Sequence, residues 1–299
     1  MTIHGPADGW VVAPDGRKFW GRAGAAGLLV VDERDRVLLQ HRVEWSHFGG
    51  TWGIPGGARQ FDESAVDGAL RESAEEAAVP PEALRLVFTS VVDLDVWTYT
   101  TVVARATRAF EPVISDGESE ALTWVPWHEV DSLPLHPGFA ATWPRLGRTL
   151  REPLHLVVDA ANVVGSRPDG WWRDRAGATD RLASSLGRLA ETGVRASDFG
   201  RPGDEVETWW PEVTLVVEGK ATAAQEPPLA SRLDLRRAEA DGDQAIVDHV
   251  RALGGAPSGP GPLVTVVTAD RGLASRVEAL GARVVGPRIL LESLDGLGA

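Results

Sequence analysis

Cysteine is absent from this chain of 299 residues, and so are long apolar runs. Without cysteine the chain can form no disulfide, thiolate zinc site, iron–sulfur cluster or cysteine nucleophile, so oxygen or histidine must hold any metal. No run comes near the roughly 18 apolar residues that span a membrane, and the first residues lack the apolar core of a secretion signal. We therefore expect a cytoplasmic protein with no membrane partner.

Basic residues are fewer than acidic ones, 30 against 43, and the formal net charge is -13. The excess is spread along the chain, because residues 1–150 carry 13 basic and 21 acidic side chains and residues 151–299 carry 17 and 22. Neither half offers the broad positive field that nonspecific nucleic-acid binding uses. The length predicts two domains at roughly 150 residues each. Hydrophobic residues at 43% and charged residues at 24% indicate a globular fold.

The first half mixes strands with one clear helix, which predicts an α+β domain over residues 1–148. A stretch from 134 to 144 is interrupted by prolines, and we expect no continuous helix there. The predicted strands cover 24–31, 36–42, 85–93, 96–106 and 121–125, and the predicted helix covers 64–79.

The second half repeats an apolar strand, a polar turn and a helix. This rhythm predicts an α/β domain with a parallel sheet over residues 149–299. The strands are expected at 154–158, 213–217 and 263–268, and the helices at 177–191, 239–252 and 272–280.

Three carboxylates gather on the predicted helix of the first half. At about 100° per residue, Glu72, Glu75 and Glu76 share one arc beside the apolar face. Like charges at this spacing repel, so helix stability does not explain them. A bound divalent cation such as Mg²⁺ or Mn²⁺ would explain why the three glutamates lie together. Hard cations of this kind also bind substrate phosphates. The alternative is a solvated acidic face on which Arg71 is a local ion-pair partner.

The spacing around these acids resembles the Nudix box, G-x5-E-x7-R-E-U-x-E-E-x-G-U, over a domain of roughly residues 20–148. Two positions depart from it, because Ser73 replaces an apolar residue and Ala78 replaces the late glycine; both concern packing and helix termination rather than metal binding. The matching positions are Gly57, Glu63, Arg71, Glu72, Glu75 and Glu76.

The resemblance implies a Nudix fold, a mixed sheet between helices, and hydrolysis of a nucleoside diphosphate-linked substrate at a phosphoanhydride bond. Glu72, Glu75 and Glu76 would be metal ligands, one of them also able to act as general base, and Gly57 would add its carbonyl. Glu63 would support the site and Arg71 would orient the glutamates.

The resemblance also indicates substrate contacts. Trp52 is one of several aromatic residues in the segments that form the pocket wall in this family, and one or two of these should touch a nucleobase. Glu118 or Glu120 lies where some members place a further catalytic or substrate-contacting glutamate, and we select Glu120; a glutamate on a loop surface is the alternative.

The second half places acids after its predicted strands. If these strands are parallel neighbours, Asp159, Glu218 and Asp270 converge at their carboxyl ends, with Asn162 and Asp243 close by. Such a cluster could bind Mg²⁺ or Mn²⁺ and cut phosphodiesters. Aspartate after a strand is also a routine turn or helix N-cap residue. The pattern resembles PIN-like and NYN ribonuclease domains, which implies RNA as a partner of this half.

Three functions remain open from the sequence. The first is a Nudix hydrolase with a second, nuclease-like domain. In the second, the PIN-like ribonuclease is the main activity and the Nudix domain recognises nucleotide or RNA ends. In the third, the Nudix domain senses a nucleotide without turning it over, which the complete set of box carboxylates disfavours.

Overall fold

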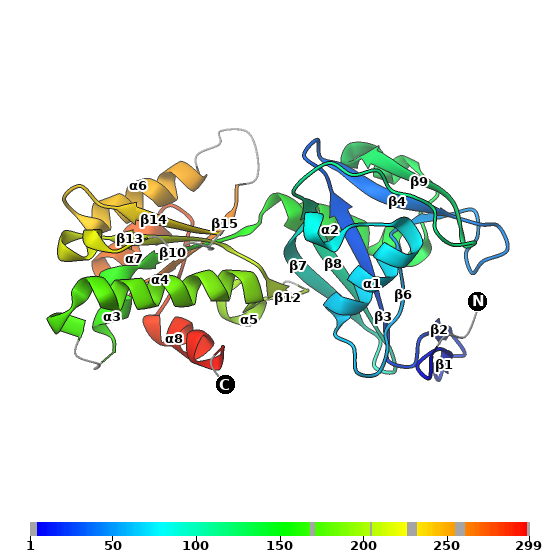
Figure 1. The fold of residues 1–299 in the computed structure, drawn as a ribbon, viewed down its shortest axis with the longest axis horizontal. Coiled ribbons are helices and arrows are strands. Elements are labelled where there is room, and N and C mark those ends of the chain that lie inside the picture. Colours follow the sequence, from blue (N-terminus) through cyan, green and yellow to red (C-terminus); the bar gives the residue numbers. More distant parts are fainter. Residues whose placement is uncertain (1–4, 168–170, 204, 226–231, 255–260, 298–299) are drawn as a thin grey trace. The chain divides into compact units, whose positions relative to one another are not determined.

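The computed structural model describes residues 5–167, 171–203, 205–225, 232–254 and 261–297. The chain divides into two compact units (Figure 1). The N-terminal unit comprises Met1–Leu150 and Glu205–Glu207, and the C-terminal unit comprises Arg151–Asp204 and Thr208–Ala299. None of the helices within these described ranges has the length and apolar character needed to cross a membrane.

The N-terminal unit is built on a mixed sheet with the order β7-β8-β3-β4-β5, in which β6 also pairs with β3 and β9 with β4. The β3–β8 pair is parallel, and the other pairs of this sheet are antiparallel. The elements are β1 (Trp10–Val12), β2 (Lys18–Trp20), β3 (Ala25–Val31), β4 (Arg36–Arg42), β5 (Trp52–Gly53), β6 (Gly56–Ala58), α1 (Ala65–Ala77), the 3-10 turn Pro81–Ala83, β7 (Leu84–Asp93), β8 (Thr98–Ala106), β9 (Ser119–Pro126), the 3-10 turn Trp127–Ser132 and α2 (Pro137–Arg151).

Helix α1 lies against β3, β6 and β8 (Figure 1). Ser64 caps its first turn by accepting the Asp67 N–H at 3.0 Å, which satisfies a donor that has no partner within the helix. Ala69 and Ala77 enter the apolar core with Leu28 of β3. Ser73 shares this buried face, and its hydroxyl donates to the Leu70 carbonyl at 3.0 Å. The polar residue in the box thus satisfies itself within the helix.

Ala78 ends α1 in the left-handed region, with φ 51°. Its N–H donates to the Ala74 carbonyl at 3.1 Å, so the backbone closes the helix as a glycine would. The left-handed conformation costs alanine free energy, because it brings the Cβ close to a backbone carbonyl oxygen, whereas glycine has no Cβ. We expect Ala78→Gly to raise the free energy of unfolding by about 1 kcal/mol in urea titrations. Ala74→Gly, inside the same helix, should instead lower it by about 1 kcal/mol, and equal effects of the two changes would contradict this explanation.

The expectation of no continuous helix at residues 134–144 was wrong. The prolines of this stretch do not prevent a helix, because α2 starts at Pro137, where the missing N–H is not needed, and continues through Pro144. Pro144 leaves one carbonyl of the preceding turn without its helical donor. Burial of an apolar stripe outweighs this loss. The stripe consists of Phe139, Trp143, Leu146 and Leu150.

The C-terminal unit has a five-stranded parallel sheet with the order β14-β13-β10-β15-β16. The chain adds strands on one side of β10 and then crosses to the other, so the order reverses between β10 and β15. The elements are β10 (Leu154–Asp159), α3 (Ala160–Gly165), the 3-10 turn Trp171–Arg173, α4 (Arg175–Thr192), β11 (Val194–Arg195), α5 (Ala196–Phe199), β12 (Val206–Trp209), β13 (Glu212–Val217), the 3-10 turn Gly219–Ala223, β14 (Leu233–Arg237), α6 (Gly242–Gly254), β15 (Leu263–Val267), α7 (Arg271–Glu278), β16 (Arg283–Val285) and α8 (Pro287–Gly296).

Helices cover both faces of this parallel sheet. On one face α6 and α7 form a core with the strands, in which Val157 and Val266 contact residues such as Ile246. On the other face α3 and α4 pack against β13, and α8 packs against them (Figure 1). The predicted parallel sheet is therefore present, and burial on both faces explains why its inner strands β10, β13 and β15 are mainly apolar.

Two histidines of the C-terminal unit are buried around one hydroxyl. The Oγ1 of Thr214 lies 2.9 Å from His155 Nε2 and 3.0 Å from His249 Nε2, so it donates to one ring and accepts from the other. Burial lowers the pKa of His155 to about 4, with a smaller contribution from His249. Burial also lowers the pKa of His249.

This network predicts acid sensitivity. The folded pKa of His155 lies below its unfolded value of 6.5, so its stabilising contribution is present above pH 6.5 and is lost as the pH falls towards 4. We expect His155→Gln, whose amide can still bond to Thr214, to lose less stability than the wild type between pH 7 and pH 4.5 in urea titrations. Parallel pH profiles of the two proteins would refute a role for this imidazole.

Candidate active site

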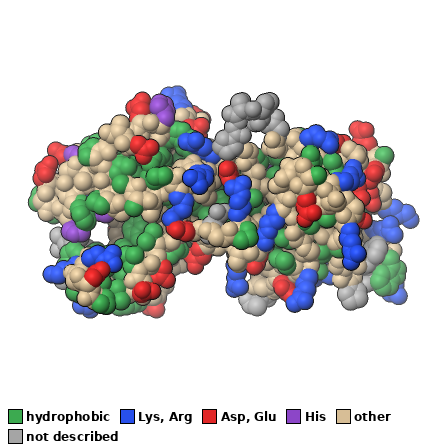
Figure 2. All heavy atoms as spheres, turned by 180° about the vertical axis from the view of Figure 1, so that it is seen from behind, with side chains coloured by type: hydrophobic (Ala, Val, Ile, Leu, Met, Phe, Trp, Pro, Cys, Tyr) green, Lys and Arg blue, Asp and Glu red, His purple; other side chains and the backbone are tan. Residues whose placement is uncertain are grey.

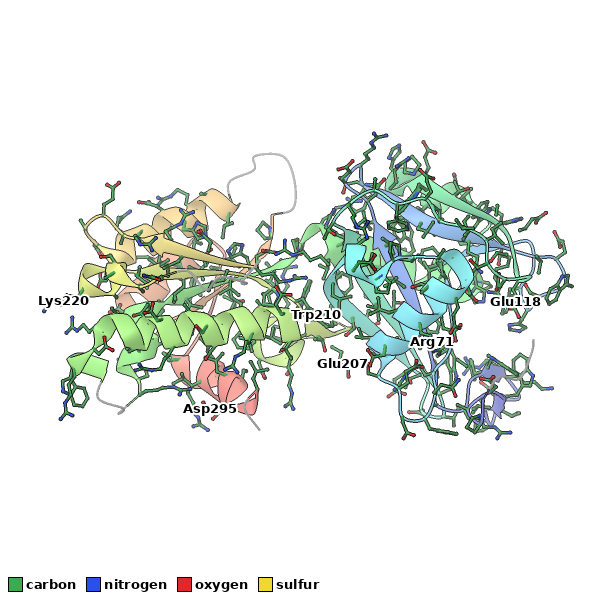
Figure 3. All side chains as sticks on the ribbon, viewed as in Figure 1. Arg71, Glu118, Glu207, Trp210, Lys220 and Asp295 are labelled. Carbon is green, nitrogen blue, oxygen red and sulfur yellow. The ribbon has the colours of Figure 1, made fainter. Side chains whose placement is uncertain are left out.

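Arg71 connects the predicted acids of the N-terminal unit (Figure 3). Its guanidinium donates to both carboxylate oxygens of Glu63, at 2.7 and 2.9 Å, and to the Ala58 carbonyl at 3.1 Å. Its remaining nitrogen donates to Glu72 at 2.8 Å and to Glu75 at 3.2 Å. The hydrogen bonds from Arg71 lower the pKa of Glu63. The same bonds to the Glu63 carboxylate raise the pKa of Arg71. Both therefore remain charged; the bidentate pair fastens the helix to the loop before it, and the bond to Ala58 fastens it to β6.

Gly57 lies directly beside Glu72. A Cβ at this glycine would stand 2.6 Å from a carboxylate oxygen of Glu72, so a larger residue would displace the acid. Burial raises the pKa of Glu72, although its bond with Arg71 opposes the rise. The glycine of the box thus leaves the room that the Glu72 carboxylate occupies.

Glu76 has the least solvated carboxyl group of the three. Its Oε2 accepts the Gly56 N–H at 3.0 Å and lies 3.4 Å from the amide nitrogen of Gln40. Burial, with smaller contributions from the charges of Glu72 and Asp116, raises the pKa of Glu76 to about 8. At neutral pH this carboxyl therefore holds a proton unless a cation compensates its charge.

A buried polar chain supports Glu76 from β4. The amide nitrogen of Gln40 donates to the Ser119 hydroxyl at 2.7 Å, which donates to Asp116 at 2.9 Å. We did not predict from the sequence that Gln40, Ser119 and Asp116 belong to the site. Gln40 carried a usable signal, because it lies two positions after Leu38 on the strand face that packs against α1, where an apolar residue is the rule.

The acids fit a divalent cation by their donor chemistry. Glu72, Glu75, Glu76 and the Gly57 carbonyl offer only oxygen, and two of the carboxyls have a raised pKa that a cation would reverse. Across the described ranges, no three His, Asp or Glu side chains are already gathered in the geometry of a metal site. Arg71 instead contacts Glu72 and Glu75, so a cation would compete with it for these oxygens.

Trp52 and Glu120, predicted to contact substrate, both lie against His41. The ring of His41 lies 4.7 Å from that of Trp52, and its Nδ1 lies 2.9 Å from Glu120. Neither residue lines the cavity beside the acids, whereas Glu118 does. The register shifts between His41 and Arg42, which pair with Ala121 and Ser119, and leaves Glu120 as the extra residue of a bulge. This bulge gives Glu118 and Glu120 different directions.

The cavity beside the acids has a volume of about 1300 Å³. Its wall includes Glu72, Glu75 and Glu76 together with many aromatic side chains. Figure 2 shows this hollow in the N-terminal unit, with hydrophobic side chains inside and histidine at its rim. The aromatic side chains that line it are Trp10, Phe19, Trp20, His47, Phe48, Trp97, Tyr99, His136 and Phe139.

The C-terminal unit also gathers predicted residues. Asp159 ends β10 and Asp270 follows β15, and the strand order reverses between these neighbouring strands. The Oδ2 of Asp159 accepts the amide of Asn162 at 2.7 Å and the hydroxyl of Thr268 at 2.9 Å. The N–H of Asp270 donates to the same hydroxyl at 3.1 Å. A polar network therefore lies at the carboxyl ends of the strands between which the order reverses, the position at which open α/β sheets place their sites.

The other two predicted acids of this unit, Asp243 and Glu218, both lie at the start of α6. Burial raises the pKa of Asp243, and the charges of Asp270 and Asp159 add to the effect, so Asp243 belongs electrostatically to the network. Glu218 accepts the Gly242 N–H at 2.8 Å, at the start of α6.

Asp159 and Asp270 also act as helix caps. Asp159 accepts the Asn162 N–H at the start of α3, and Asp270 accepts the Leu273 N–H at the start of α7. The alternative considered for these acids is therefore realised, and it leaves fewer carboxylate oxygens for a cation.

Comparison with known proteins identifies the N-terminal unit. Residues 21–146 match the NUDIX domain model. A Mycobacterium tuberculosis protein named "Putative 8-oxo-dGTP diphosphatase 3" is 51% identical over 209 residues, which cover 62% of this chain and 92% of that protein. A "Nucleoside triphosphate pyrophosphatase/Nudix hydrolase fusion protein" of Bifidobacterium longum is 43% identical over 160 residues, or 50% of this chain and 33% of that protein. The solved structure of a Nudix hydrolase from M. smegmatis, RenU, shares 46% identity with a TM-score of 0.44, over 47% of this chain and 92% of that one.

The matched domain includes the acids around Arg71 and leaves residues 1–20 and the C-terminal unit outside it. The high identity extends over nearly the whole length of the mycobacterial relative. This chain therefore belongs to the Nudix hydrolase family and is an enzyme that acts on phosphoanhydride bonds.

Proposed function

We propose that the N-terminal domain, residues 1–148, hydrolyses a nucleoside diphosphate-linked substrate with Mg²⁺ or Mn²⁺ and releases a nucleoside monophosphate. The observation that carries this proposal is the position of Glu72, Glu75 and Glu76 on the wall of one large cavity. The cytoplasm, where nucleoside triphosphates are abundant, is the location we propose for this activity.

In this proposal the chain's residues prepare the site for the cation and the substrate. Glu63 fixes Arg71, Arg71 orients Glu72, and Gly57 leaves the room that Glu72 needs. One of the three glutamates accepts the proton of the attacking water. When bound, the metal lowers the pKa of that water and neutralises charge on the phosphates.

The relative's name supports an oxidised purine nucleoside triphosphate as the first substrate to test. The experiment measures product release from 8-oxo-dGTP, dGTP, the other nucleoside triphosphates, ADP-ribose and dinucleoside polyphosphates with Mg²⁺. We expect nucleoside monophosphate and pyrophosphate from 8-oxo-dGTP, at a higher kcat/KM than from dGTP. Tight nucleotide binding without product over hours would favour the sensor function instead.

We propose as a second activity that the C-terminal domain, residues 149–299, is a PIN-like, metal-dependent nuclease that acts on RNA. Its support is the network of Asp159, Asp270 and Asp243 at the reversal of a parallel sheet. Asn162 would position Asp159, to which its amide donates. Glu218, bonded to the start of α6, is the weakest member of the predicted set.

The nuclease proposal is tested in the full chain. Asp270→Asn keeps an oxygen that can cap α7 but removes the charge, so the fold should persist while Mn²⁺-dependent RNA cleavage falls. Glu75→Gln with Glu76→Gln is the matched control, since it should leave RNA cleavage unchanged. Absence of cleavage and of Mn²⁺ binding by this unit would leave it a structural domain.

A further inference from the structure

The β1–β2 hairpin lies before the matched family domain, yet it contributes to the wall of the active-site cavity. Its strands pair Trp10 with Trp20 and Val11 with Phe19. The hairpin is fastened to the segment before β8, because Trp97 donates its indole N–H to the Trp20 carbonyl at 3.1 Å and stacks on Phe19 with ring centres 4.9 Å apart. The second strand is thus fixed, and the first presents Trp10 to the cavity.

Five rings from three separate segments continue from this hairpin around the cavity; we call them the aromatic arc. Trp20 meets Trp10 at 5.2 Å between ring centres, and Trp10 meets His47 at 5.8 Å. His47 meets Phe48 at 4.2 Å, and Phe48 meets His136 at 4.8 Å. All four contacts are edge-to-face, and all five residues line the cavity. Rings joined by their edges leave flat faces available to a ligand.

Two members of the arc are exposed more than their size would favour. Trp10 is 43% exposed and Phe48 is 45% exposed. Phe48 also adopts the left-handed region, with φ 56°, a conformation that disfavours a bulky side chain. Large apolar rings held open at the wall of a hollow indicate a surface that a ligand covers.

The same cavity combines this arc with the carboxylates of Glu72, Glu75 and Glu76. Its wall also carries the cationic side chains of Arg17 and Lys18 from the hairpin. A ligand suited to both parts carries phosphates for the metal-binding acids and a flat aromatic group for the rings. An aliphatic or sugar group would leave the ring faces without a stacking partner.

We propose that the aromatic arc is the base-binding subsite of this enzyme and that Trp10 selects nucleotides with a purine base. This proposal rests on the proposed nucleotide hydrolysis, because the phosphates of the same ligand must reach the acids. Burial lowers the pKa of His136 to about 4, so this ring faces the base as a neutral aromatic group. The indole of Trp10 offers a two-ring face that matches a purine better than a pyrimidine.

The test compares three substitutions. Trp10→Ala removes the ring, Trp10→Leu keeps apolar bulk without an aromatic face, and Trp10→Phe keeps an aromatic ring. The matched control is Trp45→Ala, because Trp45 is 67% exposed in the same loop as His47 but does not line the cavity. Thermal unfolding of each variant establishes that the hairpin change has not unfolded the domain.

Two measurements follow the base directly. The first is kcat and KM with 8-oxo-dGTP and dGTP, against 2-deoxyribose 5-triphosphate, which has no base. The second is the Kd of dGMP in EDTA by calorimetry, which requires no turnover. Trp10→Ala and Trp10→Leu should raise KM and Kd for the purine compounds roughly tenfold, with kcat and the base-free substrate unchanged. Trp10→Phe should restore most of the loss, and Trp45→Ala should have no effect.

Equal losses on the base-free and purine substrates, or an unchanged Kd in Trp10→Ala, would overturn the base-binding role. If the proposed function itself is wrong, the observation differs, because the wild type then releases no product from any triphosphate. The calorimetric arm still tests the aromatic arc in that case.

Discussion

Replacing Glu75 and Glu76 together by glutamine should lower kcat for metal-dependent nucleotide hydrolysis by about 10³-fold or more, with little change in stability. The two amides cannot supply the anionic oxygens that the proposed cation needs. Stability should persist because the wild-type Glu76 carboxyl, with its pKa raised by burial to about 8, is mostly neutral at pH 7 without metal. Glutamine imitates that form and can still accept the Gly56 N–H.

Metal titration separates a lost cation site from a damaged fold. Mg²⁺ should raise the melting temperature of the wild type, because it binds only the folded state, and should not raise that of the double variant. Binding should release protons and strengthen as the pH rises towards 8, where Glu76 ionises. Full turnover in the double variant, or an equal Mg²⁺ effect on both proteins, would contradict the assignment of these glutamates.

Removing the guanidinium of Arg71 should reduce both stability and turnover. Arg71→Ala leaves the carboxylates of Glu63 and Glu72, which are only 14% and 17% exposed, without their cationic partner. We expect the free energy of unfolding to fall by about 2–3 kcal/mol. Hydrolysis should fall as well, because Glu72 then loses the contact that fixes its orientation. Urea titration and steady-state kinetics measure the two effects.

Arg71→Lys should recover only part of either loss, because an ammonium group cannot donate to both oxygens of Glu63 in the same fork. Arg288→Ala in α8 is the matched control, since Arg288 bonds to Glu292 at 2.7 Å in a pair that is mostly exposed. That change should alter stability by less than about 0.5 kcal/mol. A similarly small effect at Arg71 would show that its network is not structural.

The Nudix hydrolase family was predictable from the sequence because the residues that mark it lie close together along the chain. A period of 3.6 residues places Glu72, Glu75 and Glu76 together whatever surrounds the helix, and Arg71 sits one residue before the first of them. The inner strands β10, β13 and β15 of the C-terminal sheet were predictable for a similar reason, since they are short, mainly apolar runs separated by helices, whereas β14 and β16 were not predicted.

The sequence was less informative where a residue's role depends on its partners in space. Glu218 follows β13, but no local pattern indicates that its carboxylate accepts the Gly242 N–H, directly before Asp243 in α6. Pro144 suggested a break, yet α2 forms around it because Trp143 and Leu146 are buried. In both cases contacts between residues that are distant in sequence decided the outcome, and local sequence preference did not.

The amino-acid sequence by itself determined the mixed-sheet fold of the N-terminal unit, the parallel sheet of the C-terminal unit, the family and the carboxylate helix, because each follows from local spacing and composition. Only the tertiary structure decided what surrounds that helix. Residues from distant segments meet in the hydrogen bonds of Gln40, Ser119 and Asp116 and in the aromatic arc. The direction of Glu120 also depends on a partner strand, β4. These contacts depend on strand pairing and on one bulge, and strand register is set by the assembled sheet, not by any single segment.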